Sequence, residues 1–174
     1  MRRASAREPV DVFLQPGEHF VGDADYRIRT LLGSCVSITL WHPVRRVGAM
    51  SHYLLPSRST STGGVLDGRY GEEVMCLMLV ELAALGISPS DCVAKIFGGG
   101  DMFPGQTRPD VRNVGVKNGE AARALLLTHQ IPVVSECLFG IGHRQIIFNV
   151  GSGDVWARQV RPTYRLLTAA TPAP

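Results

Sequence analysis

The stretch that decides the fold reads CVSITLWHPVRRVGAMSHYL, residues 35–54. Apolar residues recur at alternate positions on both sides of residues 42–45, a period typical of two half-buried strands joined by a turn. A four-residue loop at 42–45 predicts that Cys35 lies directly opposite His52. Cβ atoms of such neighbours are about 5 Å apart, close enough for a thiolate to contact an imidazole. A five-residue loop would instead pair Cys35 with Tyr53 and give a less consistent apolar face.

The Cys35–His52 pair predicts nucleophilic chemistry. A strand rather than a helix follows the cysteine, so we expect an ion pair with His52, not a helix dipole, to lower the pKa of the thiol. Cys35 would attack an acyl-type carbonyl, and His52 would protonate the leaving group and then activate water. The backbone N–H groups of the turn formed by Gly33, Ser34 and Cys35 are natural oxyanion donors, with Gly33 and Ser34 expected to position the substrate. Thr30 is the hydroxyl that we expect to orient the imidazole.

The other three cysteines show no pattern of reactivity or metal binding. Cys76 falls within an apolar helical pattern and Cys92 opens a strand, so we expect both to be inert core residues. Cys137 follows Glu136, whose charge would raise the pKa of a neighbouring thiol. The chain has no C-x-x-C pair and no closely spaced Cys/His ligands, and we expect neither a metal site nor a cofactor.

The remaining segments predict one mixed α+β domain. Helices are expected at residues 70–85 and 119–130, with Asn118 as the N-cap of the second. The last three strands are expected to form a meander. Residues 57–69 should be a mobile surface loop that either borders a substrate groove or only connects. Further strands are expected at residues 10–14, 19–22, 26–32, 92–97, 131–138, 143–150 and 155–160.

Three glycines, Gly98 to Gly100, follow the strand expected at residues 92–97. Neither a dinucleotide-binding nor a P-loop glycine pattern is present, and Asp101 would repel phosphate, so nucleotide binding is not favoured. Glycines permit close backbone approach, either to a neighbouring element or to a bound molecule. We therefore expect Phe97, Gly98 and Gly99 to form a substrate or partner surface.

Bulk composition narrows the class of protein. The chain has 174 residues, the length of one domain, and a net charge of +3 that is dispersed along the sequence. That charge is too small for a nucleic-acid footprint. No run of eighteen apolar residues and no secretory signal is present, so we expect a cytoplasmic protein with reduced thiols and no membrane insertion. Residues 1–9 are expected to be disordered, residues 10–160 to form the domain, and residues 161–174 to be a flexible tail.

Four motifs occur in the order seen in a known family, the chemoreceptor glutamine deamidases (CheD), which the chain resembles over about residues 10–160. These motifs are TLLGSCV at 30–36, GAMSHYLLP at 48–56, AKIFGG at 94–99 and NVGVKN at 113–118. The resemblance implies an α+β sandwich with a mixed sheet and two main helices, similar to deamidating bacterial toxins of the cysteine hydrolase type. It places the family's Cys, His and Thr at Cys35, His52 and Thr30.

The resemblance also implies a reaction and partners. The reaction is hydrolysis of glutamine side-chain amides on cytoplasmic helices of methyl-accepting chemotaxis receptors, through a thioester and without a cofactor, to regulate chemotaxis. A CheC-type phosphatase is an implied partner. Two alternatives stay open: a binding regulator of such a phosphatase with little activity of its own, and a glutamyl methylesterase using the same chemistry.

Overall fold

The computed structural model describes residues 8–59, 63–105 and 109–160. Most of the segment predicted to be disordered, the predicted tail at 161–174, and three residues of the loop at 57–69 lie outside the described residues. The elements in chain order are β1 (Val10–Phe13), β2 (His19–Gly22), β3 (Tyr26–Leu32), β4 (Val36–His42), β5 (Val47–Ser51), α1 (Gly71–Ala84), the 3-10 turn η1 (Pro89–Asp91), β6 (Val93–Gly98), α2 (Pro109–Thr128), β7 (Val133–Leu138), β8 (His143–Asn149) and β9 (Val155–Val160).

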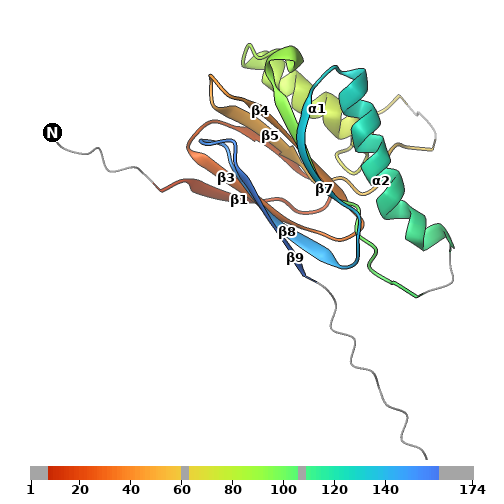
Figure 1. Cartoon of the computed structure of the whole chain (residues 1–174). Coiled ribbons are helices and arrows are strands. Elements are labelled where there is room, and N and C mark those ends of the chain that lie inside the picture. The colour runs from red at the N-terminus through yellow and green to blue at the C-terminus, as the bar shows by residue number, and fades with distance from the viewer. Residues whose placement is uncertain (1–7, 60–62, 106–108, 161–174) are drawn as a thin grey trace, which may run out of the picture.

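The strands form two mixed sheets. The four-stranded sheet has the order β1-β3-β8-β9, and the five-stranded sheet has the order β2-β5-β4-β6-β7. Each sheet contains one parallel pair, β1 with β3 and β6 with β7. Both helices cover one face of the five-stranded sheet, and the four-stranded sheet packs on its other face (Figure 1). This arrangement confirms the predicted α+β class with mixed sheets and two helices.

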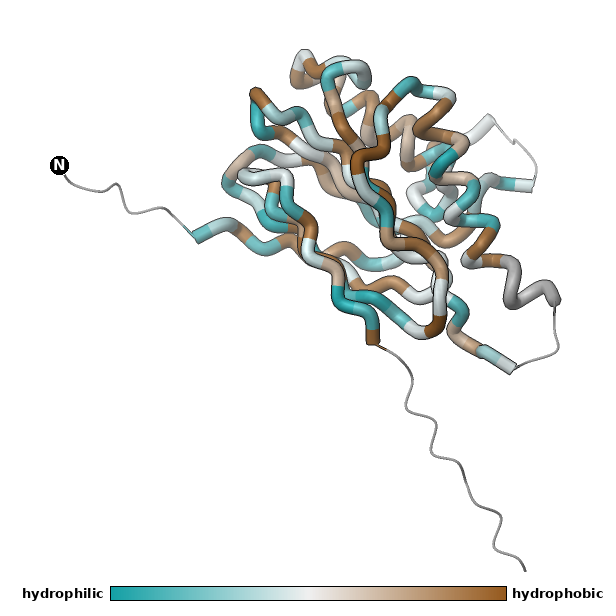
Figure 2. Tube along the Cα trace, viewed as in Figure 1, coloured by the Kyte–Doolittle hydropathy of each residue, from teal (hydrophilic) through white to brown (hydrophobic). Residues whose placement is uncertain are grey.

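Two hydrophobic cores separate the three layers. One lies between the helices and the five-stranded sheet and includes Val36, Ile38 and Leu40 from β4. The other lies between the two sheets and includes Met50 of β5 and Phe148 of β8. Brown, hydrophobic positions accordingly recur along the strands in the interior of the molecule (Figure 2). Because neighbouring residues of a strand point to opposite faces, β4 contributes to both cores.

The hairpin of β4 and β5 has a four-residue loop, but it lies one residue later than predicted. Trp41 pairs with Gly48 rather than with Arg46. The His42 carbonyl accepts the Arg46 N–H at 2.8 Å, and Arg46 takes the left-handed conformation, φ 52°, that closes the turn. Each residue of β4 therefore pairs with a residue of β5 that lies two positions later in the chain than predicted. Because side chains alternate with a period of two, the predicted faces are kept, while the predicted direct opposition of Cys35 and His52 is wrong.

The first predicted helix is confirmed and the second is longer than predicted. α1 ends where expected, since Gly86 has φ 72°. α2 begins at Pro109, so Asn118 lies inside the helix and is not an N-cap. Two glycines of α2 are required by packing. A Cβ on Gly115 would lie 2.5 Å from the Gly99 carbonyl oxygen, and one on Gly119 would lie 2.5 Å from the ring of Phe139.

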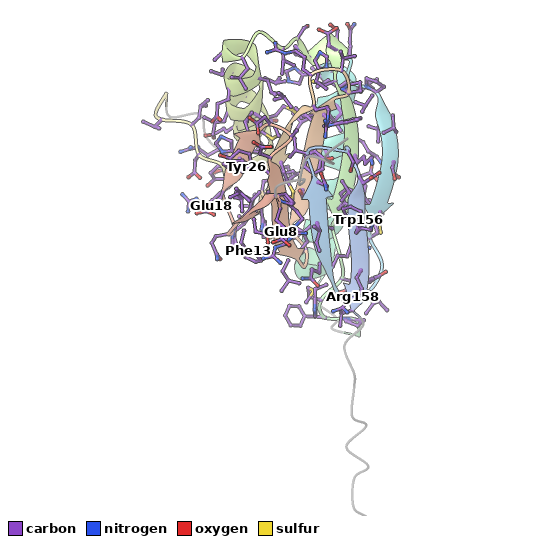
Figure 3. All side chains as sticks on the ribbon, turned by 90° about the vertical axis from the view of Figure 1, so that its left-hand side faces the viewer. Glu8, Phe13, Glu18, Tyr26, Trp156 and Arg158 are labelled. Atoms are coloured by element: carbon purple, nitrogen blue, oxygen red, sulfur yellow. The ribbon has the colours of Figure 1, made fainter. Side chains whose placement is uncertain are left out.

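The closing strands are not a meander. β7 joins the five-stranded sheet beside β6, whereas β8 and β9 form a hairpin in the four-stranded sheet beside β3. The turn between β7 and β8 therefore crosses from one sheet to the other. Side chains of β9, among them Trp156 and Arg158, are exposed at the edge of the four-stranded sheet (Figure 3). Cys76 of α1 is exposed too, contrary to the prediction that it fills the core.

Candidate active site

A buried threonine and a buried histidine join the two sheets. Thr30 comes from the inward face of β3, and His52 follows the last residue of β5. Thr30 is 0% exposed and His52 is 2% exposed. Thr30 Oγ1 lies 2.7 Å from His52 Nδ1. The predicted contact between Thr30 and His52 is thus present. It spans the layer between the sheets, so the two chain segments are fixed relative to each other.

The hydrogen bonds of Thr30 decide which imidazole nitrogen carries the proton. Thr30 Oγ1 donates its single hydrogen to the Leu14 carbonyl oxygen at 2.7 Å, an acceptor that cannot donate. The same oxygen must then accept from His52, so Nδ1 bears the hydrogen. Nε2 is left with a free lone pair, as a general base requires.

Cys35 and His52 lie on the same face of the five-stranded sheet, on two neighbouring backbone segments. Val36 and Tyr53 are backbone partners, joined by N–H to O=C bonds of 3.1 and 3.0 Å. Cys35 and His52 precede these two residues, which makes them diagonal rather than direct neighbours. Diagonal neighbours have Cα atoms about 7–8 Å apart, within reach of an aromatic side chain. Cys35 is only half-buried, so small groups can approach it from solvent.

The environment favours a neutral pair. Burial raises the pKa of the Cys35 thiol, and the backbone N–H of Cys35 itself lowers it by less. Burial lowers the pKa of the His52 imidazole, and the Leu14 carbonyl and the Glu18 charge raise it by less. Both shifts oppose the thiolate–imidazolium ion pair that the sequence predicted. Burial therefore disfavours charge on both side chains.

The turn that carries Cys35 is held by three backbone carbonyls. The Gly33 carbonyl accepts the Gly100 N–H and the Cys35 carbonyl accepts the Gly99 N–H, each at 2.9 Å. The Ser34 carbonyl accepts from Asn118 Nδ2 at 3.0 Å. Within the described parts of the chain, the N–H groups of Ser34 and Cys35 have no acceptor. They are therefore free to stabilise negative charge on a bound molecule.

Phe97, Gly98 and Gly99 are buried behind this turn and do not form an exposed surface, so that prediction is wrong. The alternative, close approach to a neighbouring element, is what the structure shows. Gly98 has φ 115°, and a Cβ there would lie 2.2 Å from the Cys35 carbonyl oxygen. The Gly98 carbonyl in turn accepts from Arg144 Nη1 at 2.8 Å, and Arg144 is only 1% exposed.

Asn118 is the site residue that sequence reasoning assigned wrongly. It is 0% exposed, and its Nδ2 donates to the Ser34 carbonyl and, at 2.8 Å, to the Leu54 carbonyl. The main-chain carbonyl of Asn118 accepts a hydrogen bond from Tyr53 Oη at 2.5 Å. The available signal was its position at the end of the NVGVKN motif, which the predicted helix start at residue 119 concealed.

Other features of the described residues lie away from this site or are absent. A hollow of about 270 Å³ is lined by residues of β8 and β9, including Ile147 and Trp156, and contains none of the predicted site residues. Among residues 8–59, 63–105 and 109–160, no three His, Cys, Asp or Glu side chains are grouped so that they could hold a metal ion. No helix in the same ranges has the length and apolar character needed to cross a membrane.

Fold and site together define an α+β protein that buries a Thr–His pair beside a half-buried cysteine on a backbone turn. Comparison with known proteins places it more narrowly. The family model for CheD chemotactic sensory transduction matches residues 54–159. The chain belongs to the CheD family. The matched segment begins just after His52, so the family match itself does not include Thr30, Cys35 or His52.

Similar proteins cover nearly the whole chain. A protein of Albidiferax ferrireducens named probable chemoreceptor glutamine deamidase CheD 2 is 63% identical over 157 residues, which is 90% of this chain and 91% of that protein. One of Dechloromonas aromatica named probable chemoreceptor glutamine deamidase CheD 3 is 45% identical over 153 residues, 88% of this chain and 89% of that protein. These lengths extend across the candidate site as well as the matched family segment.

Among solved structures, the hypothetical protein YfiH of Bacillus licheniformis is 16% identical with a TM-score of 0.41, over 71% of this chain and 49% of that protein. This similarity is too low to bear on the site. The resemblance to deamidating toxins stays a prediction.

Proposed function

We propose that this protein hydrolyses glutamine side-chain amides of chemoreceptors to glutamate, with Cys35 as the nucleophile and His52 as the base. The observation that carries the proposal is the Thr30–His52 hydrogen bond, which leaves the Nε2 lone pair free on the face that Cys35 shares. The names of the similar proteins, chemoreceptor glutamine deamidases, support the substrate and the reaction.

The directions of the two pKa shifts suggest the order of the proton transfers. His52 Nε2 takes the thiol proton as Cys35 Sγ attacks the amide carbon, because burial disfavours a thiolate formed in advance. The Cys35 N–H, aided by that of Ser34, stabilises the oxyanion that develops. The imidazolium then returns the proton to the leaving nitrogen, which departs as ammonia and leaves a thioester. Water, deprotonated by Nε2, attacks the thioester to release glutamate and the thiol.

Thr30 acts on the imidazole and not on the substrate. By accepting from Nδ1–H it holds the ring in the tautomer whose Nε2 can accept the thiol proton. Its position between the Leu14 carbonyl and the imidazole gives it one arrangement in which both hydrogen bonds form. A side chain without a hydroxyl at this position would release that choice of tautomer.

The proposal also covers location and partners. A chemoreceptor glutamine presented on a cytoplasmic helix requires that the enzyme act in the cytoplasm. A CheC-type phosphatase is proposed as a second partner, on the resemblance of the chain to the CheD family.

Mass spectrometry of receptor cytoplasmic fragments tests the proposal. Incubation with the wild-type protein is expected to convert specific glutamines to glutamate, an increase of about one mass unit per site, with release of ammonia. Cys35→Ala should abolish the conversion, and Cys76→Ala should not, since Cys76 is an exposed residue of α1 remote in sequence from the site. Conversion that survives Cys35→Ala would refute the mechanism.

The two alternatives have their own outcomes in the same assay. Methyl-esterified glutamates in the same fragments, supplied as competitors, distinguish a methylesterase, which would consume the ester and spare the amide. A tight complex with a CheC-type phosphatase and no conversion of any receptor fragment would indicate a binding regulator.

A further inference from the structure

We infer that Asn118 is a positioning residue for the oxyanion site, because its side-chain amide fixes the plane of the Ser34–Cys35 peptide. This inference rests on the proposed function in one respect only, that Cys35 attacks a carbonyl group. It assigns a role to the end of the NVGVKN motif, which lies on a helix and not in the turn that carries the cysteine.

Peptide geometry connects Asn118 to the Cys35 N–H. In a trans peptide the C=O of one residue and the N–H of the next lie in one plane and point in opposite directions. Asn118 Nδ2 binds the Ser34 carbonyl at 3.0 Å. The Cys35 N–H must therefore point away from Asn118.

The same amide also fixes the segment beyond the histidine. Its second hydrogen goes to the Leu54 carbonyl at 2.8 Å, two residues after His52. One NH₂ group thus bridges the backbone next to the proposed nucleophile and the backbone next to the proposed base. Any movement of Asn118 would alter the spacing of the two segments as well as the direction of the Cys35 N–H.

The orientation of the Asn118 amide is unambiguous. The reverse orientation would place Oδ1 against two carbonyl oxygens, with no hydrogen between them. In the observed orientation Oδ1 is buried and has no partner among the described residues. Buried polar atoms are generally satisfied, and an exception calls for an explanation. The explanation is that the donor end, which holds the two carbonyls, decides how the amide lies.

Tyr53 provides a matched control. Its hydroxyl binds the main-chain carbonyl of Asn118 at 2.5 Å and contacts neither Ser34 nor the Asn118 side chain through a hydrogen bond. Tyr53→Phe therefore loosens the attachment of α2 without removing the amide. Asn118→Leu, similar in volume, removes the amide and both of its hydrogen bonds.

The test compares two reactions of Cys35 in the full chain. Acylation by p-nitrophenyl acetate passes through an oxyanion, and alkylation by iodoacetamide does not. We expect Asn118→Leu to slow acylation about 10- to 100-fold, somewhat less than the loss of a whole oxyanion donor, while alkylation changes by less than about threefold. Tyr53→Phe should change neither rate beyond about threefold. If Asn118→Leu does not fold, Asn118→Ala takes its place in the same comparison.

The result that overturns the inference is an unchanged ratio of the two rates. Equal slowing of both reactions would mean that Asn118 only supports the fold around the thiol, and unaltered acylation would mean that it does not orient the N–H. The outcome is separate from that of the proposed function, because p-nitrophenyl acetate reports on the thiol even if no receptor glutamine is converted.

Discussion

Replacing Thr30 by valine tests the central contact of the site. Valine keeps the volume of threonine and removes the hydroxyl that links the Leu14 carbonyl to His52 Nδ1. Leaving one buried polar group without a partner costs about 1–3 kcal/mol. The hydroxyl satisfies two such groups, the Leu14 carbonyl and the His52 Nδ1–H. We therefore expect a loss of stability of about 2–6 kcal/mol, of which the imidazole accounts for about 1–3 kcal/mol.

The catalytic effect follows from the same free energy. If the imidazole loses that amount of preference for the orientation and tautomer that expose Nε2, kcat falls about 5- to 150-fold. The assay is ammonia release from a receptor fragment at saturating substrate, with urea unfolding to measure stability. Thr30→Ser is the control, since it keeps the hydroxyl and loses a methyl group, and should cost about 0.5–1.5 kcal/mol with kcat within about threefold. A folded valine variant with normal kcat, or a serine variant as slow as it, would refute the role assigned to the hydroxyl.

Three further predictions concern other groups. Burial lowers the pKa of His52, so the folded state binds fewer protons than the unfolded state, and the free energy of unfolding should fall as pH drops below about 6.5. Urea unfolding should give a lower free energy of unfolding at about pH 5.5 than at about pH 7.5, and His52→Gln should reduce this difference. Gly98→Ala forces a Cβ to 2.2 Å from a backbone oxygen at φ 115° and should cost about 3 kcal/mol or more, whereas Gly64→Ala, with open space around it, should be nearly neutral in thermal unfolding. Iodoacetamide at pH 8 should label exposed Cys76 before Cys92, which is 2% exposed with its pKa raised to about 11 by burial and Asp91; equal labelling in peptide mapping would contradict the burial.

The hairpin shows which part of the site could be predicted from the sequence. Alternation assigned Cys35 and His52 to the same face, and this result survives the displaced register because a shift of two residues preserves the faces. The position of the loop could not be predicted, since it depends on a left-handed Arg46 that no local preference indicates. The predicted direct opposition therefore became a diagonal relation.

The helix α2 shows where local reasoning fails. Gly115 and Gly119 have poor helical propensity, and only the nearby Gly99 backbone and the Phe139 ring explain why no larger residue fits. Those partners come from segments far away in the chain, so the requirement is not visible locally. The same error hid Asn118, which in a loop would have been an ordinary cap.

The burial of Cys35 and His52 also could not be predicted from the sequence pattern. The ion pair was predicted from the presence of a thiol and an imidazole, but the protonation state depends on how much water each group loses. His52 is enclosed by both sheets, and only the assembled fold shows this. The structure shows the contact between Thr30 and His52, whereas burial opposes the predicted charge on Cys35 and His52.

The three carbonyl bonds that hold the turn at Gly33, Ser34 and Cys35 have a consequence for entropy. Ordering the backbone of a residue costs about 1–2 kcal/mol, so about 3–6 kcal/mol of disorder in these three residues is removed when the protein folds. Gly100, Asn118 and Gly99 supply the bonds that offset this loss. A bound glutamine side chain then meets a turn that is already ordered, and none of its binding free energy is consumed in ordering it.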